Sequence, residues 1–292
     1  SEDGLIATAY HCVWDMLAHA SGPNENLVDD GFYAATRADE RWAGPNASVK
    51  LTLSITEVTE DTLAGTKKLS GRQYADRVAT NKKQLIRRCE GKAGVTCSVE
   101  TFDHGTGFRL VEQKELKDIR VVYSPPKDVG YFGGDADNWQ WPRHSGDFAF
   151  VIAYADSSGS PATYASGNTA YNPDYFLKVA KGPKPGAFVM VAGYPSGTYR
   201  WLTAAEIDYA KEEEYPRRIQ TSEAVLKILT DFEEDFPDRA SKVQPRILSL
   251  GNQVQYLNGN LVAFDKLRAT ERKWRFEEDF SQWVVANSER QE

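Results

Sequence analysis

The sequence predicts a β-rich region, a barrel or a sandwich, over residues 1–203, followed by a helical region over residues 204–292. Short runs of alternating apolar residues, separated by glycine- and proline-rich turns, recur as far as about residue 200. Beyond Thr203 glycine becomes scarce, and apolar residues recur at the spacing of a helix. We therefore expect two domains with a boundary near residue 203.

Each apolar run of period two predicts one strand of the first region. Residues 5–11 are apolar on both faces, which is typical of a strand buried in an interior. Residues 51–59 alternate leucine and isoleucine with serine and threonine, which predicts a strand with one wet face. Further strands are expected at residues 97–102, 108–112, 119–123, 148–154 and 187–195.

Helical patterns occur both inside and after the β-rich region. Residues 13–20 have the pattern of one or two helical turns. Residues 71–89 place apolar side chains on one face, and we interpret the lysines and arginines between them as a solvated helix face. Pro237 and Pro245 interrupt the helical spacing of the last third, and a further helix is expected from about Gln253 to Asn287.

The composition indicates a folded globular protein and excludes several classes of function. Hydrophobic residues make up 41% of the 292 residues and aromatic residues 12%, which is enough to form a core. The net charge of -7 provides no basic surplus for a phosphate backbone, so nucleic acid is not expected as a partner. No apolar run approaches the roughly 20 residues of a membrane-spanning helix. The first residues have the pattern of a turn and a strand, not of a signal peptide.

Three cysteines bear on the cellular compartment. Cys89 and Cys97 flank a short polar stretch, and a disulfide between them would add about 2–3 kcal/mol of stability in the chain-entropy model. Cys12 is then left over, and we expect it to be unpaired because its partner lies before Ser1. Three free thiols in a cytosolic protein are the alternative. The absence of a C-x-x-C pair excludes a zinc ribbon and a C-x-x-C redox motif.

The segment 131–150 (YFGGDADNWQWPRHSGDFAF) combines three acidic residues, two tryptophans and a histidine. The alternating apolar strand begins directly after Asp147, which places this carboxylate at a loop-to-strand junction. A rigid sheet can hold a carboxylate there while the loop supplies its partners. A surface turn with amphipathic aromatic residues is the simpler interpretation of the loop by itself.

His11 follows the first apolar run in the pattern T-A-Y-H-C. A lone histidine is more often structural than catalytic, but this pattern looks like the histidine site of chymotrypsin-like serine peptidases. In those enzymes the imidazole takes a proton from a serine, and a buried aspartate fixes its tautomer. Asp147 suits the second place in the chain order His, Asp, Ser. We expect its carboxylate within about 2.6–3.2 Å of a His11 ring nitrogen.

The motifs DNWQWPRHSGDFAF, DGLIATAYHC and FVMVAGYPSGTYR are together similar to the bacterial dipeptidyl-peptidase 7 and 11 family of serine peptidases. The resemblance extends from about Asp3 to the C terminus and is strongest in residues 129–155 and 186–200. It implies a mainly β, chymotrypsin-like catalytic region of the double β-barrel type, incomplete here, followed by the first part of an α-helical cap domain. It also implies release of dipeptides from peptide N termini through an acyl-enzyme, with no cofactor and no metal.

The resemblance implies a role for five residues. His11 corresponds to the catalytic histidine and Asp147 to the aspartate of the triad. Asn138 and Trp139 correspond to residues that bind the free α-amino group of the substrate, and Asn252 to a further asparagine of that amine site. An ammonium group needs such fixed acceptors. The implied partners are peptides with a free N terminus, the implied assembly is a homodimer, and the implied location is the periplasm or the cell exterior.

Two departures from the family pattern bear on activity. Ala9 and Tyr10 stand where the family has an asparagine and a histidine, whereas the catalytic histidine is kept. No G-N-S-G-S-P nucleophile motif is present, and DSSGSP at residues 156–161 has the composition of a hairpin turn, so Ser158 is not expected to be the nucleophile. In the family the serine follows the helical domain. We therefore expect it beyond residue 292, and expect this chain to be an inactive N-terminal fragment.

Two other classes of function stay open at this point. A non-catalytic relative would keep the fold and bind peptide ends, and the coding sequence after residue 292 would distinguish it from an enzyme. A carbohydrate-binding β-module would use Trp139 and Trp141 as stacking platforms. Such a module predicts exposed, coplanar rings and no contact between His11 and Asp147.

Overall fold

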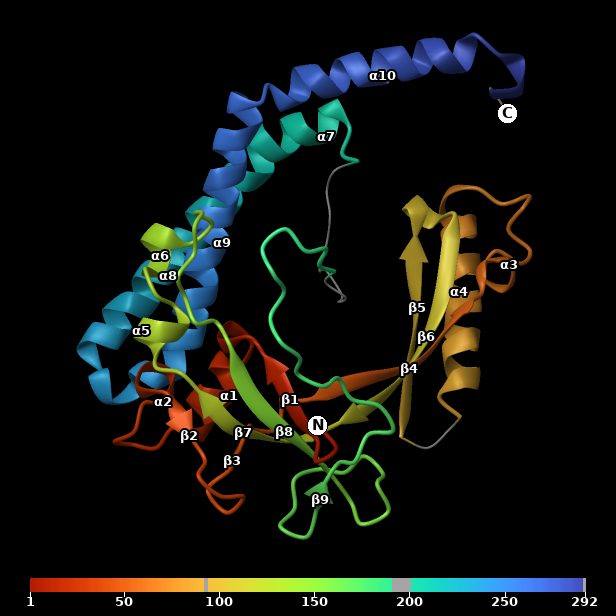
Figure 1. The fold of residues 1–292 in the computed structure, drawn as a ribbon. Coiled ribbons are helices and arrows are strands. Elements are labelled where there is room, and N and C mark those ends of the chain that lie inside the picture. The colour runs from red at the N-terminus through yellow and green to blue at the C-terminus, as the bar shows by residue number, and fades with distance from the viewer. Residues whose placement is uncertain (92–93, 191–200, 291–292) are drawn as a thin grey trace. The chain divides into compact units, whose positions relative to one another are not determined.

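The computed structural model describes residues 1–91, 94–190 and 201–290 (Figure 1). The chain divides into two compact units, each assembled from segments that are distant in sequence. Unit 1 comprises Ser1–Ala20, Gly31–Pro125 and Phe148–Lys178, and unit 2 comprises Ser21–Asp30, Pro126–Asp147 and Val179–Glu292. The two units are defined by their contacts, and each consists of several segments of the chain. They therefore do not test the domain boundary near residue 203, which stays a prediction.

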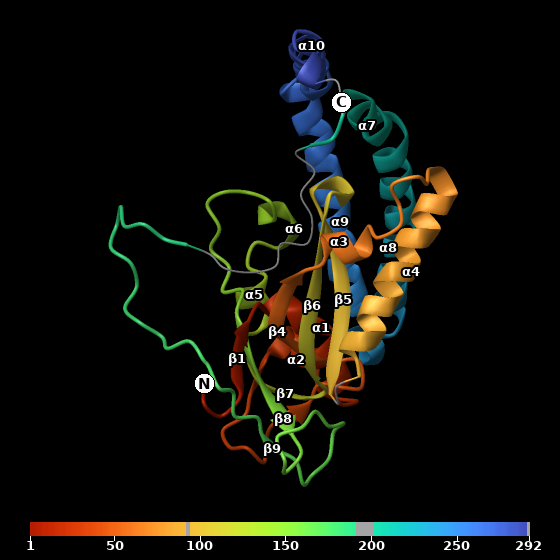
Figure 2. The same cartoon turned by 90° about the vertical axis from the view of Figure 1, so that its right-hand side faces the viewer.

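The larger sheet of unit 1 is antiparallel throughout, with the strand order β1-β8-β7-β2 (Figures 1 and 2). Strand β3 also pairs with β7, and β9 pairs with β8. The central strands β7 and β8 carry the side chains of the core, because they have neighbours on both sides. The strands are β1 (Leu5–Thr8), β2 (Phe32–Tyr33), β3 (Arg41–Trp42), β7 (Asp118–Ser124), β8 (Ala149–Ala155) and β9 (Thr169–Ala170).

Strand β1 is shorter and more exposed than its apolar sequence predicts. It ends at Thr8, and a 3-10 turn over Tyr10–Cys12 follows, so the strand expected to reach residue 11 stops early. The expectation that β1 is buried on both faces is wrong, because β1 lies at the edge of its sheet and Leu5 is 38% exposed. Tyr10 is fully buried, and the helix α1 (Trp14–Ala20), which confirms the prediction for residues 13–20, follows the turn.

The smaller sheet of unit 1 has the strand order β4-β6-β5 and carries the helix α4 against it. Val58, Leu85, Val99 and Phe108 form the core between this helix and the sheet. The amphipathic pattern of residues 71–89 therefore predicted the helix and its buried face correctly. The elements are β4 (Val49–Glu57), α3 (Thr59–Thr62), α4 (Gly71–Cys89), β5 (Val95–Phe102) and β6 (Gly107–Leu116).

A disulfide bond joins Cys89, the last residue of α4, to Cys97 in β5, with the two Cα atoms 6.2 Å apart. This distance lies within the roughly 4.4–6.8 Å that a disulfide requires. The bond ties the end of the helix to the sheet that its apolar face covers. Within the described part of the chain, Cys12 carries a free and exposed thiol.

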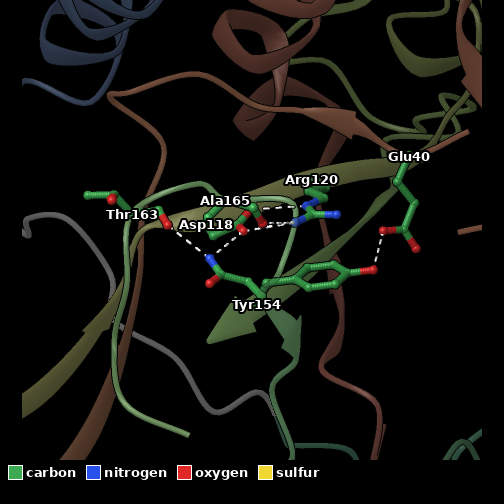
Figure 3. A network of polar contacts seen from close by, with 7 residues as sticks. Glu40, Asp118, Arg120, Tyr154, Thr163 and Ala165 are labelled. Carbon is green, nitrogen blue, oxygen red and sulfur yellow. Dashed lines mark hydrogen bonds and ion pairs between the residues drawn. The ribbon is translucent and has the colours of Figure 1, made fainter. Parts of the chain in front are cut away.

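Two residues of β7, Asp118 and Arg120, form a buried ion pair in the larger sheet (Figure 3). Asp118 is fully buried and accepts two hydrogen bonds from Arg120, at 3.0 and 2.9 Å, and a third from Asn168 at 2.9 Å. Burial by itself would lower the pKa of Arg120, but the hydrogen bonds and charge of Asp118 outweigh it and raise the pKa. Arg120 also donates to the carbonyl of Ala165, and Asn168 to that of Thr163. The network thus holds residues 163–168 against β7.

Unit 2 is helical, as the sequence predicts for the last third of the chain. Ala210, Tyr215 and Leu257 form its core, with Tyr256 packed against them. Thr203 begins the first long helical segment with a capping box, in which its side chain and that of Glu206 each accept the other's backbone N–H. The helices are α2 (Leu27–Asp30), α5 (Lys127–Gly130), α6 (Gly134–Asp137), α7 (Ala204–Tyr209), α8 (Tyr215–Asp235), α9 (Ala240–Lys266) and α10 (Ala269–Val285).

Two expectations for the second half of the chain are wrong. The helix expected over residues 253–287 is two helices, because Arg268 adopts a left-handed backbone (φ 49°) between α9 and α10. Residues 187–190 form no strand, since no described strand pairs with them, and the side chain of Phe188 is 91% exposed. Residues 191–195 of that expected strand lie outside the described residues. No helix among those described is long and apolar enough to cross a membrane.

Candidate active site

The motif loop of unit 2 starts after α5 and ends at Asp147. Gly133 has a left-handed backbone (φ 78°), and a Cβ atom there would collide with the carboxylate of Asp137. The N–H of Gly146 donates to the carbonyl of Val129 at 2.8 Å, which brings the end of the loop back to its start. The two glycines therefore shape a closed loop, and α6, within this loop, lies beside α9 (Figure 1).

Three of the predicted site residues meet in this loop. The Oδ1 atom of Asn252, on α9, accepts hydrogen bonds from Asn138 Nδ2 at 2.9 Å and from Trp139 Nε1 at 3.1 Å. Asn138 and Asn252 are half-buried, whereas Trp139 is 59% exposed. The structure thus brings together Asn138, Trp139 and Asn252 from segments more than 100 residues apart in the sequence.

The indole ring of Trp139 is oriented by the helix that carries Asn252. Its centroid lies 5.3 Å from that of Tyr256, with the rings tilted by 47°. Tyr256 is one turn after Asn252 on α9, so both residues face the loop side of the helix. Trp139 itself has a left-handed backbone (φ 61°), which is uncommon for a bulky residue and is typical of functional sites.

Arg143 completes this cluster, although the sequence analysis assigned it no role. Its Nη1 atom donates to Asn138 Oδ1 at 3.1 Å and to the carbonyl of Asp137 at 3.2 Å. Its Nη2 atom donates to Ser145 Oγ at 3.1 Å. The place of Arg143 in the tryptophan-rich motif was the available signal, and the i, i+4 spacing from Asn252 was the signal for Tyr256.

His11 belongs to unit 1 and Asp147 to unit 2. His11 is the middle residue of the 3-10 turn after β1, and its exposed ring lies edge-on to Trp14 at 6.2 Å. Buried Tyr10 fixes this turn, so the next side chain points outward. Asp147 is exposed and directly precedes the segment that forms β8. The pairing of His11 with Asp147 stays a prediction.

Ser158 lies in a turn and not at a nucleophile site. Its Oγ atom lies 2.6 Å from Asp156 Oδ1 and 3.0 Å from Ser160 Oγ. The backbone N–H groups of Ser158 and Ser160 also donate to the Asp156 carboxylate. The hydrogen bond from the Ser158 side chain is the largest of the effects that lower the pKa of Asp156. These contacts are those of the predicted hairpin turn. The partner of the Ser158 hydroxyl is an aspartate that stays ionised, and not a histidine base.

The side chains of this cluster suit binding of a polar group. Over residues 1–91, 94–190 and 201–290, no group of three or more histidine, cysteine, aspartate or glutamate side chains is arranged to hold a metal ion. The cluster of the motif loop instead presents side-chain amides, an indole and a guanidinium. Such neutral amide oxygens can accept hydrogen bonds from an ammonium group without a change in their own charge.

The two sheets, the helical unit and the tryptophan-rich loop are those of a family of peptidases. The chain belongs to the Peptidase S46 family, whose family model matches residues 1–292. It is 35% identical over 288 residues to an Asp/Glu-specific dipeptidyl-peptidase of Shewanella putrefaciens, covering 98% of this chain. It is 29% identical over 286 residues to dipeptidyl-peptidase 7 of Capnocytophaga gingivalis, covering 97% of this chain.

A solved structure has the same fold. The crystal structure of Porphyromonas endodontalis DPP11 in complex with the dipeptide Arg-Glu matches 98% of this chain with a TM-score of 0.87 and 27% sequence identity. The chain covers 42% of that protein's chain, and 39% and 40% of the two relatives above. It therefore spans about two fifths of the proteins it resembles.

Proposed function

We propose that this chain is part of a serine-type dipeptidyl aminopeptidase, an enzyme that releases dipeptides from the free N terminus of peptides. The observation that carries the proposal is the contact of Asn138 and Trp139 with Asn252 in a chain of the Peptidase S46 family. The names of the relatives support the same activity, since they are dipeptidyl-peptidases. The DPP11 structure with a bound dipeptide supports peptides as the substrates.

In the proposed mechanism, the amine site fixes how far the substrate extends beyond the scissile bond. The N-terminal ammonium donates a hydrogen bond to an amide oxygen of the cluster, and Trp139 excludes water beside it. A peptide anchored by its first amino group then presents its second peptide bond for cleavage. An acetylated N terminus has no ammonium, so it loses this anchor.

The chemical step is assigned to His11 and Asp147. His11 takes the proton of a serine hydroxyl as that oxygen attacks the carbonyl carbon, and then gives the proton to the leaving amine. Asp147 fixes the tautomer of His11 and stabilises the imidazolium. None of the described residues is assigned as that serine. We assign the sheets of residues 1–203 to a chymotrypsin-like double barrel and the helices of residues 204–292 to a cap, in a homodimeric enzyme of the periplasm or the cell exterior.

Replacing Asn138 with alanine in the full-length protein tests the amine site. Hydrogen bonds to a charged group are worth about 1.5–3 kcal/mol, so kcat/KM for a dipeptidyl coumarin substrate with a free N terminus should fall by roughly 10- to 100-fold. The N-acetylated version of the substrate should be cleaved poorly and equally by both proteins, since it makes no ammonium contact. The measurement is the ratio of the two kcat/KM values in each protein.

Asn258, an exposed asparagine on the same helix as Asn252, provides the matched control. Asn258→Ala should keep the wild-type preference for a free N terminus. An Asn138→Ala protein that still strongly prefers the free N terminus would contradict the amine-site assignment. A full-length protein that cleaves neither substrate would contradict the proposed activity.

A further inference from the structure

We infer that Arg143 is a positioning residue that fixes the orientation of the Asn138 side-chain amide, so that its oxygen and not its nitrogen faces the substrate ammonium. The inference rests on the proposed function, because it concerns the amine site of that function. It follows from three hydrogen bonds that connect Trp139, Asn252, Asn138 and Arg143 in one series.

A side-chain amide has a donor end and an acceptor end of nearly equal shape, so its direction is set by its partners. An indole N–H can only donate, and Trp139 Nε1 therefore requires the oxygen of Asn252 on its side. That oxygen also accepts from Asn138, so the nitrogen of Asn138 must face Asn252. The oxygen of Asn138 then faces the opposite way, toward Arg143.

Arg143 closes the series because a guanidinium also can only donate. Donor-only groups thus stand at both ends, and the two amides between them have one arrangement that satisfies every contact. A carbonyl oxygen has two acceptor sites. Both sites of Asn252 Oδ1 are used in the cluster, whereas Asn138 Oδ1 accepts one hydrogen bond there, from Arg143. Asn138 Oδ1 is therefore the amide oxygen with room for the ammonium.

The positive charge of Arg143 also opposes binding of the ammonium, because it lies next to the oxygen that would receive this second positive group. The contacts of Nη1 with the carbonyl of Asp137 and of Nη2 with Ser145 Oγ anchor the guanidinium to the motif loop. A glutamine at position 143 could present either a donor or an acceptor to Asn138, so only the contact with Asn252 would then hold the amide of Asn138 in its direction. An amide that turned over would offer N–H groups to the ammonium. A lysine would remain donor-only.

The test compares Arg143→Gln, Arg143→Met and Arg143→Lys in the full-length protein, using free and N-acetylated dipeptidyl coumarin substrates. Loss of one charge-assisted hydrogen bond predicts that Gln and Met raise KM for the free substrate by about 10-fold or more, with a smaller change in kcat. Lys should restore most of this loss. None of the three should change the poor cleavage of the acetylated substrate. Ser145→Ala should weaken binding far less than Arg143→Gln, because it leaves the contact with Asn138 intact.

Arg218→Gln is the matched control, since this arginine belongs to the same unit and its ion pair with Glu214 is within one helical segment. An equal loss of substrate binding in all three Arg143 variants, or an equal loss with both substrates, would indicate a structural role and overturn the inference. A wild-type KM in Arg143→Gln would also overturn it.

Calorimetric binding of the free dipeptide Arg-Glu separates this inference from the proposed function. An inactive wild type that binds this dipeptide with the same dependence on Arg143 would refute only the proposed activity. A wild type that neither cleaves substrates nor binds the dipeptide would refute both.

Discussion

Replacing His11 with alanine in the full-length protein is expected to lower kcat for dipeptidyl substrates by roughly 10⁶-fold, and Asp147→Asn by roughly 10⁴-fold. The loss is large because the histidine and the serine act as one unit, so the hydroxyl has no proton acceptor once the imidazole is removed. Asp147→Asn keeps the shape of the side chain but favours the wrong tautomer of His11. The double variant should be little worse than His11→Ala, because the two residues serve the same proton transfer.

The measurement is kcat and KM for each variant, together with circular dichroism to check folding. His19→Gln and Asp174→Asn are matched controls, since each changes an exposed residue of the same type in the same unit as His11. Both controls should retain wild-type activity. Variants of His11 or Asp147 that fold normally and lose less than about tenfold in kcat would contradict their assignment as base and orienting carboxylate.

Asp118→Ala is expected to destabilise unit 1 by about 3–5 kcal/mol, because it leaves the largely buried charge of Arg120 without its negative partner. Arg120 is 13% exposed in its side chain, and Asp118 is fully buried. Asn168 loses an acceptor in the same change, so residues 163–168 lose one of the two hydrogen bonds that join them to β7 (Figure 3). Such a loss is a large part of the total stability of an ordinary domain, about 5–15 kcal/mol.

Denaturation in urea, followed by tryptophan fluorescence, measures this loss. Trp42 reports on the region, since its ring stacks on Tyr164 at 4.9 Å, inside the segment that the network holds. The control is Asp231→Asn, which removes an exposed ion pair with Lys227 and should leave the unfolding midpoint unchanged. An unfolding midpoint of Asp118→Ala equal to that of the wild type would show that Arg120 finds water or another acceptor, contrary to the prediction.

Local periodicity predicted the elements whose neighbours are close in sequence. The apolar face of α4 could be predicted because Val78, Leu85 and Ile86 follow helical spacing, and they pack against the core that the following strands share. The edge position of β1 was not readable, because it depends on the order of the strands in the sheet and not on the sequence of β1. The break at Arg268 was also hidden, since arginine carries no signal for a left-handed backbone.

Only those residues of the candidate site that lie in a motif of the sequence could be predicted. The tryptophan-rich motif pointed to Asn138 and Trp139, and a weaker match pointed to Asn252. The direction of the hydrogen bonds among them could not be predicted, because it depends on which side-chain atoms meet across more than 100 residues of sequence. Arg143 was missed although it lies in the same motif as Asn138, because the contact between the two side chains becomes evident only when the loop is closed.

Mass spectrometry of the products tests the dipeptidyl-peptidase proposal most directly. The full-length protein is incubated with an unblocked peptide of about ten residues and with the same peptide acetylated at its N terminus. The proposal predicts that dipeptides are released one after another from the N terminus of the unblocked peptide, while the acetylated peptide stays intact, as an amine site of Asn138, Trp139 and Asn252 requires. Release of single amino acids, cleavage at internal bonds, or equal cleavage of the two peptides would contradict it.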